Sequence, residues 1–292
     1  MAANLHYLFY VDYYGDLKKG DQTEASLKAL DFSEKNNVLV GATPTPAQPP
    51  LPEDLAFLPG FAPQTFSLVT TYPGLLAGIG SPHTVGDNDS EIKLGFSLDP
   101  VTGLPYLPAS GVKGVLRSAF RNAEPYVADQ LREILKLPEE APPELLEKLE
   151  TAVFGEWCGD DEKTKKQTAG PVERDVFLDA VVTGTPQNGT VLALDSITPH
   201  RNWETPSLDG LTEPIPLTLL RVKPGVTFTF SFLLRESSFG GGTTVKAEQK
   251  AALFKAILQD LGVGAKTHTG YGYLEEPQPD RAARTNTGIE KS

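Results

Sequence analysis

Hydrophobic residues recur at helical spacing in several stretches of the chain. In 110–125 the apolar positions are Val112, Val115, Leu116, Ala119 and Phe120, and Ser110 is the expected N-cap. Two further helices are predicted at about 126–136 and 143–153, on either side of a proline-rich break. A fourth, amphipathic helix is predicted at 246–261.

Strand patterns fill most of the remaining chain. A core strand with a turn at Pro73-Gly74 is predicted in 66–79, and short strands at 92–98 and 271–274. Residues 172–182 and 190–197 predict a hairpin, and 214–222 and 226–234 flank a Lys-Pro-Gly turn. The strict alternation in 227–232 is typical of a strand with one polar face. Residues 6–14 are rich in β-formers and predict a strand or an aromatic anchor for a partner.

The order of these elements predicts the fold class. Strand, helix, hairpin, further strands, helix, glycine-rich loop and strand fit an α+β, ferredoxin-like (RRM-like) βαββαβ core with insertions. We expect a single domain over 1–276 with a proline-rich connector at 43–64 and a helical acidic insertion at about 126–170. The tail, 277–292, has no pattern and is expected to be disordered.

Composition narrows the class of protein. The 292 residues are 39% hydrophobic and 22% charged, which suits a globular protein with a buried core. No stretch approaches the roughly 18 apolar residues of a membrane span, so we expect no membrane contact and a cytoplasmic location. The single cysteine, Cys158, excludes an intramolecular disulfide and argues against a thiolate metal cluster. We expect neither a metal nor another cofactor.

The net charge is unfavourable for general nucleic-acid binding. The chain has 26 basic and 38 acidic residues, a net charge of −12. Residues 129–162 contain 11 Asp/Glu and 3 Lys/Arg, a net of −8, so the rest of the chain carries −12 + 8 = −4. Phosphate contacts depend on a local surface. The charge therefore argues against non-specific binding but leaves a shaped, locally basic groove open.

The start of the helix at 110–125 is the first candidate site. A proline turn, Pro105 to Pro108, leads into Ser110 and Gly111, where unpaired backbone N–H groups of a first helical turn attract phosphate. Lys113, Arg117 and Arg121 follow at i, i+4 and i+8 and form one basic stripe. A basic triplet alone is more often a solvated helix face. Its combination with the proline turn favours a phosphate-binding role.

The glycine-rich stretch 262–272 is the second candidate site. Four glycines in eleven residues, Gly262, Gly264, Gly270 and Gly272, allow a ligand to approach the backbone closely. Lys266, Thr267 and His268 are candidate phosphate contacts, and Tyr271 is a candidate for stacking on a base. A helix C-cap explains Gly262 without any ligand. It does not explain the other three glycines.

Together these two segments resemble the RAMP superfamily of CRISPR-associated proteins, which has a similar helix start and a C-terminal glycine-rich loop. Intervening motifs resemble the sixth RAMP subunit of type III-B (Cmr) effector complexes. They are Leu76-Ala77-Gly78-Ile79-Gly80 with His83, Val153-Phe154-Gly155, Phe177-Leu178-Asp179-Ala180, Leu194 to His200, and Pro214 to Phe232. The resemblance runs from about Leu75 to Leu274.

The resemblance implies an RNA-binding, non-catalytic subunit of a ribonucleoprotein that acts in antiviral defence. Its partners would be the 3′ part of the CRISPR guide RNA, other RAMP subunits of the complex, and target RNA indirectly. His200 and Arg201 are either RNA-facing or structural. Trp157 and Trp203 are expected to be core or interface anchors.

Two other readings remain open. An endoribonuclease of the same superfamily would use His83 or Asp87, in the long loop before the helix, for acid–base or metal-assisted chemistry. Most loop aspartates cap turns instead, and no metal-ligand spacing is present. A purely structural adaptor would show no RNA contact at 110–121 or 262–273.

Overall fold

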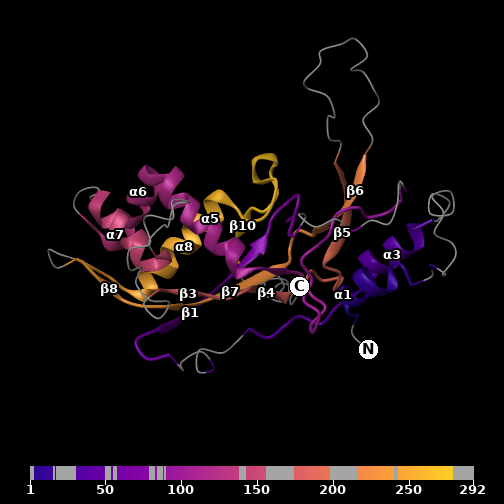
Figure 1. Ribbon diagram of the computed structural model, residues 1–292, viewed down its shortest axis with the longest axis horizontal. Coiled ribbons are helices and arrows are strands. Elements are labelled where there is room, and N and C mark those ends of the chain that lie inside the picture. Colours follow the sequence, from indigo (N-terminus) through magenta and orange to yellow (C-terminus); the bar gives the residue numbers. More distant parts are fainter. Residues whose placement is uncertain are drawn as a thin grey trace, which may run out of the picture.

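A computed structural model describes residues 3–15, 17, 31–49, 54, 58–78, 83, 88, 90–137, 143–155, 174–197, 216–239 and 243–278. It is a mixed α+β structure (Figure 1). Its main sheet contains β1 (Ala62–Thr70), β2 (Tyr106–Leu107), β3 (Val176–Phe177), β4 (Ala180–Gly184), β7 (Thr227–Leu234) and β10 (Leu274–Glu275). Its long helices are α5 (Ala109–Asn122), α6 (Glu124–Leu135), α7 (Pro143–Phe154) and α8 (Ala247–Leu261). No described helix is long and apolar enough to cross a membrane.

The main sheet is antiparallel and is built around β7. The strand order is β10-β1-β7-β4-β2, and β3 also pairs with β7. The β1–β7 ladder is the longest, from Ala62↔Leu234 to Val69↔Thr227. Because β7 has neighbours on both edges, its position in the sheet is fixed by pairings with segments far apart in the sequence.

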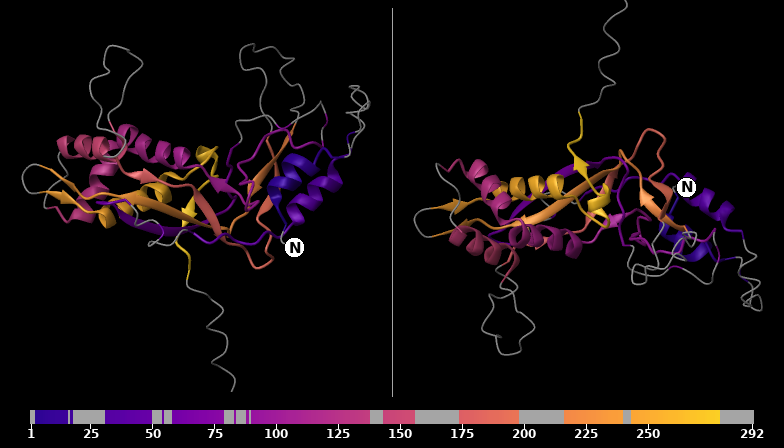
Figure 2. Two further views of the ribbon diagram at one scale, coloured as in Figure 1. Left: turned by 60° about the horizontal axis from the view of Figure 1, so that its bottom comes forward. Right: turned by 90° about the horizontal axis from the view of Figure 1, so that it is seen from above.

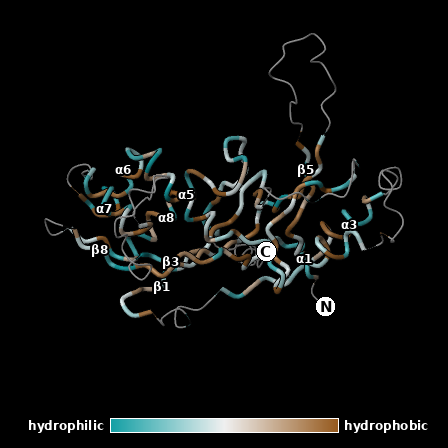
Figure 3. The backbone as a smooth tube through the Cα atoms, in the orientation of Figure 1, coloured by the Kyte–Doolittle hydropathy of each residue, from teal (hydrophilic) through white to brown (hydrophobic). Residues whose placement is uncertain are grey.

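Helices α5 and α8 pack on one face of the main sheet, with α6 and α7 beyond them (Figure 1). Phenylalanines fill the interface: Phe254 of α8 lies 5.5 Å from Phe232 of β7 and 5.7 Å from Phe177 of β3, measured between ring centroids. Hydrophobic residues concentrate where these helices meet the sheet (Figure 3). Burial of such aromatic area is the main source of stability for this layer.

The remaining elements lie towards the two ends of the molecule (Figure 2). At one end are α1 (Leu5–Tyr7), the π-helical η1 (Leu8–Asp12), α3 (Ser33–Gly41), and a two-stranded sheet of β5 (Leu192–Ile197) and β6 (Leu217–Val222). At the other end are α6, α7, and the short hairpin of β8 (Ser237–Ser238) and β9 (Thr244–Val245). A single 3-10 turn, η6 (Thr267–Thr269), lies between α8 and β10.

The helices at about 126–136, 143–153 and 246–261 are confirmed within two residues, but the predicted hairpin of 172–182 with 190–197 is wrong. The strand β5 pairs with β6, from Leu192↔Val222 to Ile197↔Leu217. The strand β4, which was expected to pair with 190–197, pairs instead with β7 and β2. The turn at 223–225 therefore connects two different sheets. Local turn residues indicate where strands end but not which strands pair.

Three further expectations need correction. The 6–14 segment is helical, because Leu5, Phe9 and Tyr13 are buried at i, i+4 and i+8. Residues 92–98 form no strand of the sheet. The polar side of β7 is not solvated: Thr229 is 5% exposed, and its hydroxyl lies 2.8 Å from the hydroxyls of both Ser67 and Thr183. The helix α3 is not predicted by the sequence pattern, because its apolar residues Val38, Leu39 and Val40 are consecutive and show no helical spacing.

Candidate nucleic-acid interface

The helix α5 begins two residues earlier than an N-cap at Ser110 predicts, so Ser110 is not its N-cap. The helix starts at Ala109, with Pro108 at the cap position. The Ala109 N–H donates to Oδ1 of Asp179 at 2.7 Å, and the N–H groups of Gly111 and Val112 both donate to the Pro108 carbonyl. Three N–H groups of the first turn, those of Ala109, Gly111 and Val112, therefore already have acceptors, which corrects the expectation that the turn is unpaired. A carboxylate from the segment after β3 already satisfies the leading N–H group.

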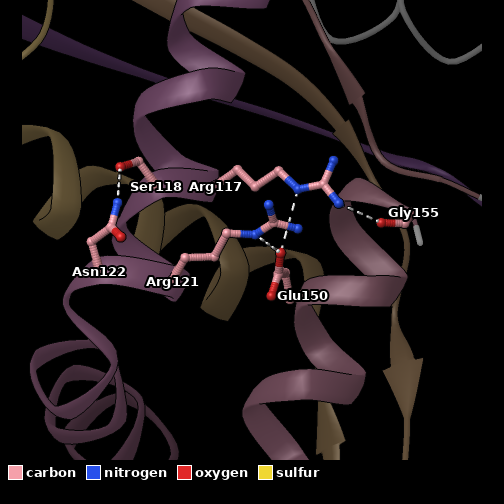
Figure 4. A network of polar contacts seen from close by, with 6 residues as sticks. All are labelled: Arg117, Ser118, Arg121, Asn122, Glu150 and Gly155. Carbon is pink, nitrogen blue, oxygen red and sulfur yellow. Dashed lines mark hydrogen bonds and ion pairs between the residues drawn. The ribbon is translucent and has the colours of Figure 1, made fainter. Parts of the chain in front are cut away.

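The two arginines of the basic stripe are bound to α7 (Figure 4). Nε of Arg117 lies 3.3 Å from Glu150 Oε1, and its NH2 group donates to the Gly155 carbonyl at 3.0 Å. Nε of Arg121 donates to the same Glu150 oxygen at 2.8 Å. Both guanidinium groups thus hold α7 against α5. A phosphate would compete with Glu150 for them.

Lys113, the third basic residue of the stripe, is in a different situation. Its ammonium lies 5.5 Å from the centroid of the Phe177 ring and makes no ion pair or hydrogen bond with any described residue. Burial lowers the pKa of Lys113, and the positive charges of Arg174 and Arg117 lower it further. Lys113 lines a cavity of about 320 Å³ with Ala109, Ser110, Arg174, Asp175, Val176 and Phe177, here named the Lys113 pocket. An anion in this pocket would reduce repulsion among the cations.

The loop 262–272, the glycine loop, is held by backbone contacts. The Ala265 N–H donates to the Leu76 carbonyl at 2.9 Å, and the Gly272 N–H donates to the Gly74 carbonyl at 2.8 Å. Positive φ and close packing explain two of its glycines: a Cβ on Gly264 would lie 2.4 Å from the Leu76 oxygen, and one on Gly272 only 1.9 Å from the Val263 oxygen. These two glycines are needed for the loop's own packing. Gly262 and Gly270 also have positive φ.

A groove of about 490 Å³ separates α5 from the glycine loop, and we name it the glycine-loop groove. One wall contains Gly114, Val115, Ser118, Ala119, Asn122 and Ala123, and the other contains Leu261, Gly262, Gly264, Thr267 and His268. In the described structure, the side chains of Lys266 and His268 make no hydrogen bond or ion pair. The two segments singled out in the sequence, whose nearest wall residues Ala123 and Leu261 are 261 − 123 = 138 positions apart, therefore border one groove.

The basic stripe does not face this groove. With about 100° per residue, the mean direction of Lys113, Arg117 and Arg121 lies about 120° around α5 from that of Ser118 and Asn122. Arg121 is nearest to the groove, at about 60° from Ser118. A third cavity of about 250 Å³ adjoins both sites: it shares Ser110 with the Lys113 pocket, and Val115 and Gly264 with the glycine-loop groove. Gly111 lines this third cavity. Lys113 and the glycine loop are thus connected around the start of α5 and do not oppose each other across one cleft.

Tyr271 is anchored through its hydroxyl. The hydroxyl donates to Asp195 Oδ2 at 2.6 Å. Burial, and then this hydrogen bond, raise the pKa of Tyr271 to about 12.

His83 is buried and bound on both sides of its ring. It is 7% exposed, its Nδ1 lies 3.0 Å from the Ile92 carbonyl oxygen, and its Nε2 lies 2.8 Å from that of Phe9. The ring stacks on Phe9 at 3.8 Å. The remaining candidates, Asp87, His200, Arg201, Trp157 and Trp203, lie outside the described residues. Among the residues that are described, no group of three His, Cys, Asp or Glu side chains could hold a metal ion.

Several residues that shape the interface were missed from the sequence. Asp179 caps α5, Glu150 binds both arginines, and Asp195 binds Tyr271. Asp179 and Asp195 lie within motifs that carry the RAMP resemblance, which was the available signal. Glu150 had none, because it is one acidic residue in an acidic helical stretch.

The sequence model of the RAMP superfamily matches residues 67–275. The chain belongs to the RAMP superfamily. It is 29% identical over 187 residues to the CRISPR system CMR subunit Cmr6 of Saccharolobus solfataricus, which covers 62% of this chain and 48% of that protein. It is 28% identical over 219 residues to the CRISPR system Cmr subunit Cmr6 of Pyrococcus furiosus, which covers 60% of this chain and 58% of that protein. The chain thus spans about half the length of these curated relatives.

Two solved structures resemble this RAMP chain. A chain in the cryo-EM structure of the Type III-B Cmr-beta complex bound to cognate target RNA has a TM-score of 0.48 at 22% identity, covering 75% of this chain and 60% of that one. The crystal structure of Cmr6 from Pyrococcus furiosus has a TM-score of 0.43 at 23% identity, covering 74% of this chain and 99% of that one.

Proposed function

We propose that this chain is an RNA-binding, non-catalytic subunit of a type III-B (Cmr) CRISPR effector complex and contacts the 3′ part of the guide RNA. The observation that carries the proposal is the glycine-loop groove, where the two RAMP signature segments meet; Thr267 and His268 line it, and Lys266 directly precedes them in the loop. The similarity to two proteins named as Cmr6 subunits supports the assembly. Other RAMP subunits are the expected protein partners, with target RNA an indirect one.

The chemistry of the groove suits a sugar–phosphate backbone better than a small ligand. Its walls combine hydroxyl, amide and imidazole groups with glycine positions where a polymer backbone can approach closely. Gly111 and Gly114 of α5 have no atom within 4 Å of the place where a Cβ would lie. Within a helix such glycines cost stability without any packing reason inside the described structure. A closely approaching strand of RNA supplies such a reason.

Lys113 gives the proposed RNA path a second phosphate contact. The Lys113 pocket is linked to the groove through the third cavity, which shares Ser110 with the pocket and Val115 and Gly264 with the groove, so one strand could pass around the start of α5 and contact both sites. Among Lys113, Arg117 and Arg121 of α5, Lys113 is the one whose charged group has no carboxylate partner in the described part of the chain. We therefore assign phosphate neutralisation to Lys113 and Lys266 first, and to Arg117 and Arg121 only if Glu150 is displaced.

The strand order supports a ferredoxin-like βαββαβ core for this subunit. Taking β1, β4, β7 and β10 as its four strands, the order β10-β1-β7-β4 is 4-1-3-2, with α5 after the first strand and α8 after the third. In this reading the second sheet and α6–α7 are insertions.

A nuclease that uses His83 is the less favoured function. Both imidazole nitrogens lie within hydrogen-bond distance of backbone carbonyls, so neither is available to exchange a proton with a substrate in this conformation. We propose that His83 holds the N-terminal helix against residues 90–96. Purified chain that cleaves RNA, with cleavage abolished by His83→Ala or Asp87→Ala, would restore the nuclease hypothesis.

The proposal is tested by charge reversal in the reconstituted complex. Lys266→Glu, and separately Lys113→Glu, should weaken retention of guide RNA and reduce RNA crosslinks to 110–121 and 262–273, because each replaces phosphate attraction by repulsion. Lys148→Glu, on the exposed face of α7, is the matched control and should have no effect. Unchanged RNA content in both test variants, with normal folding and assembly, would favour a purely structural adaptor.

A further inference from the structure

Asp195, on β5, is tied to the glycine loop across 76 positions of the sequence. Its Oδ2 accepts the Tyr271 hydroxyl hydrogen bond at 2.6 Å and lies 3.0 Å from Nε of Arg221 on β6. Its Oδ1 accepts the N–H of Ser196 at 2.8 Å. The carboxylate is thus oriented by three groups, and one of them belongs to the loop.

Arg221 connects the same carboxylate to the segment on which the glycine loop rests. Its NH1 group donates to the Pro73 carbonyl. The next residues of that segment are clamped on both sides: Leu75 exchanges two backbone hydrogen bonds with Val222 of β6, and the Gly74 carbonyl accepts the Gly272 N–H. The base of the β5–β6 hairpin, 73–76 and the glycine loop therefore form one hydrogen-bonded unit.

A carboxylate at this position is electrostatically unfavourable for the proposed function. A negative charge beside a phosphate-binding loop repels RNA, and pairing with Arg221 reduces that repulsion only in part. The Asp195 carboxylate is compatible with RNA binding if its main effect is to hold the glycine loop in position. The Tyr271 hydroxyl can donate in only one direction, and a charged acceptor makes this bond stronger than a bond to a neutral group.

We propose that Asp195 is a positioning residue for the glycine loop: by holding the Tyr271 hydroxyl, it fixes the loop that presents Lys266, Thr267 and His268 to RNA. This inference rests on the proposed function and adds to it a residue outside both signature segments. It also gives Tyr271 a role through its hydroxyl instead of its ring.

The sign of the effect of Asp195 variants separates positioning from simple charge. If Asp195 acted only as a nearby negative charge, Asp195→Ala and Asp195→Asn would both tighten RNA binding. If it positions Tyr271, Asp195→Ala should weaken binding of labelled guide RNA to the reconstituted complex by about 10- to 100-fold, as expected for loss of a charge-assisted hydrogen bond. Asp195→Asn keeps an oxygen acceptor and should remain within about threefold of wild type.

Tyr271→Phe removes the same hydrogen bond from the other side and deletes a single oxygen atom. It should weaken RNA binding by the same factor as Asp195→Ala, and the double variant should be no weaker than either single variant, because both remove one interaction. Tyr273→Phe is the matched control and should bind as wild type. Hydrogen exchange should accelerate at the amides of 265–272 while the melting temperature of the complex changes little, a local response that a general structural role would not produce.

The outcomes distinguish this inference from the function on which it rests. If Lys266→Glu weakens RNA binding but Tyr271→Phe does not, the positioning role is refuted and the proposed function stands. If Lys266→Glu and Tyr271→Phe both leave binding unchanged, both are refuted. Additive losses in the double variant would also overturn the positioning role, since they would show two independent contributions.

Discussion

Replacing Gly114 by alanine should make this protein more stable and weaken its binding to RNA. Gly114 lies in the interior of α5, is exposed, and does not have a positive φ. Nothing within 4 Å would contact the added methyl group. An exposed helical glycine costs about 0.8–1 kcal/mol relative to alanine, so Gly114→Ala should raise the free energy of unfolding by about that amount.

The same methyl group would project into the glycine-loop groove, where Gly114 forms part of the α5 wall. A strand held against the helix would have to move away from it. Losing one charge-assisted hydrogen bond costs about 1.5–3 kcal/mol, which corresponds to a roughly 10- to 100-fold weaker affinity.

The assay pairs urea denaturation of the chain with guide-RNA binding by the reconstituted complex. Gly41→Ala is the matched control, because Gly41 is a helical residue at the end of α3 with no atom within 4 Å of an added Cβ. It should give a smaller stability gain and unchanged RNA affinity. Gly114→Ala with a stability gain and unaltered RNA affinity would refute an RNA path along this wall, and a stability loss would refute the open space beside α5.

Three further predictions follow from the described contacts. Asp175 and Lys250 form an ion pair at 2.8 Å, and both side chains are 1% exposed. Lys250→Met should therefore lower the free energy of unfolding by about 3–5 kcal/mol, and the double variant Asp175→Leu with Lys250→Met should recover most of that loss. Equal losses of stability in the single and double variants would contradict the prediction. Gly272→Ala should lower the free energy of unfolding, measured by urea denaturation, by about 1–3 kcal/mol, because Gly272 has a positive φ and the added Cβ would clash with the Val263 carbonyl oxygen. An unchanged free energy of unfolding would contradict this loop geometry. Because the native state lowers the pKa of Lys113, the contribution of this residue to folding stability increases as the pH rises. RNA affinity should begin to decrease at a pH below the ordinary lysine pKa, because Lys113 loses its charge there. Lys113→Arg should abolish this decrease between pH 7 and 10, and identical pH profiles of affinity for the variant and the wild type would refute the prediction.

Periodic and local features were readable from the sequence alone. The helices α5 and α8 follow from apolar residues at helical spacing, and β7 from its alternation of phenylalanine with small polar residues. The signature segments around Ser110 and Gly264 were sufficient to indicate the RAMP superfamily. These features could be predicted because each depends on neighbours within a few residues along the chain.

The tertiary structure decided which groups meet. The strand β5 pairs with β6 and not with β4, Glu150 binds the arginines of the basic stripe, and Asp195 reaches Tyr271. None of these contacts has a local signal, because a strand edge or a carboxylate accepts many partners and only chain packing selects one. The sequence determined the helices α5 to α8, the signature motifs and the family. The fold determined that α5 faces the glycine loop with small residues while its arginines hold α7.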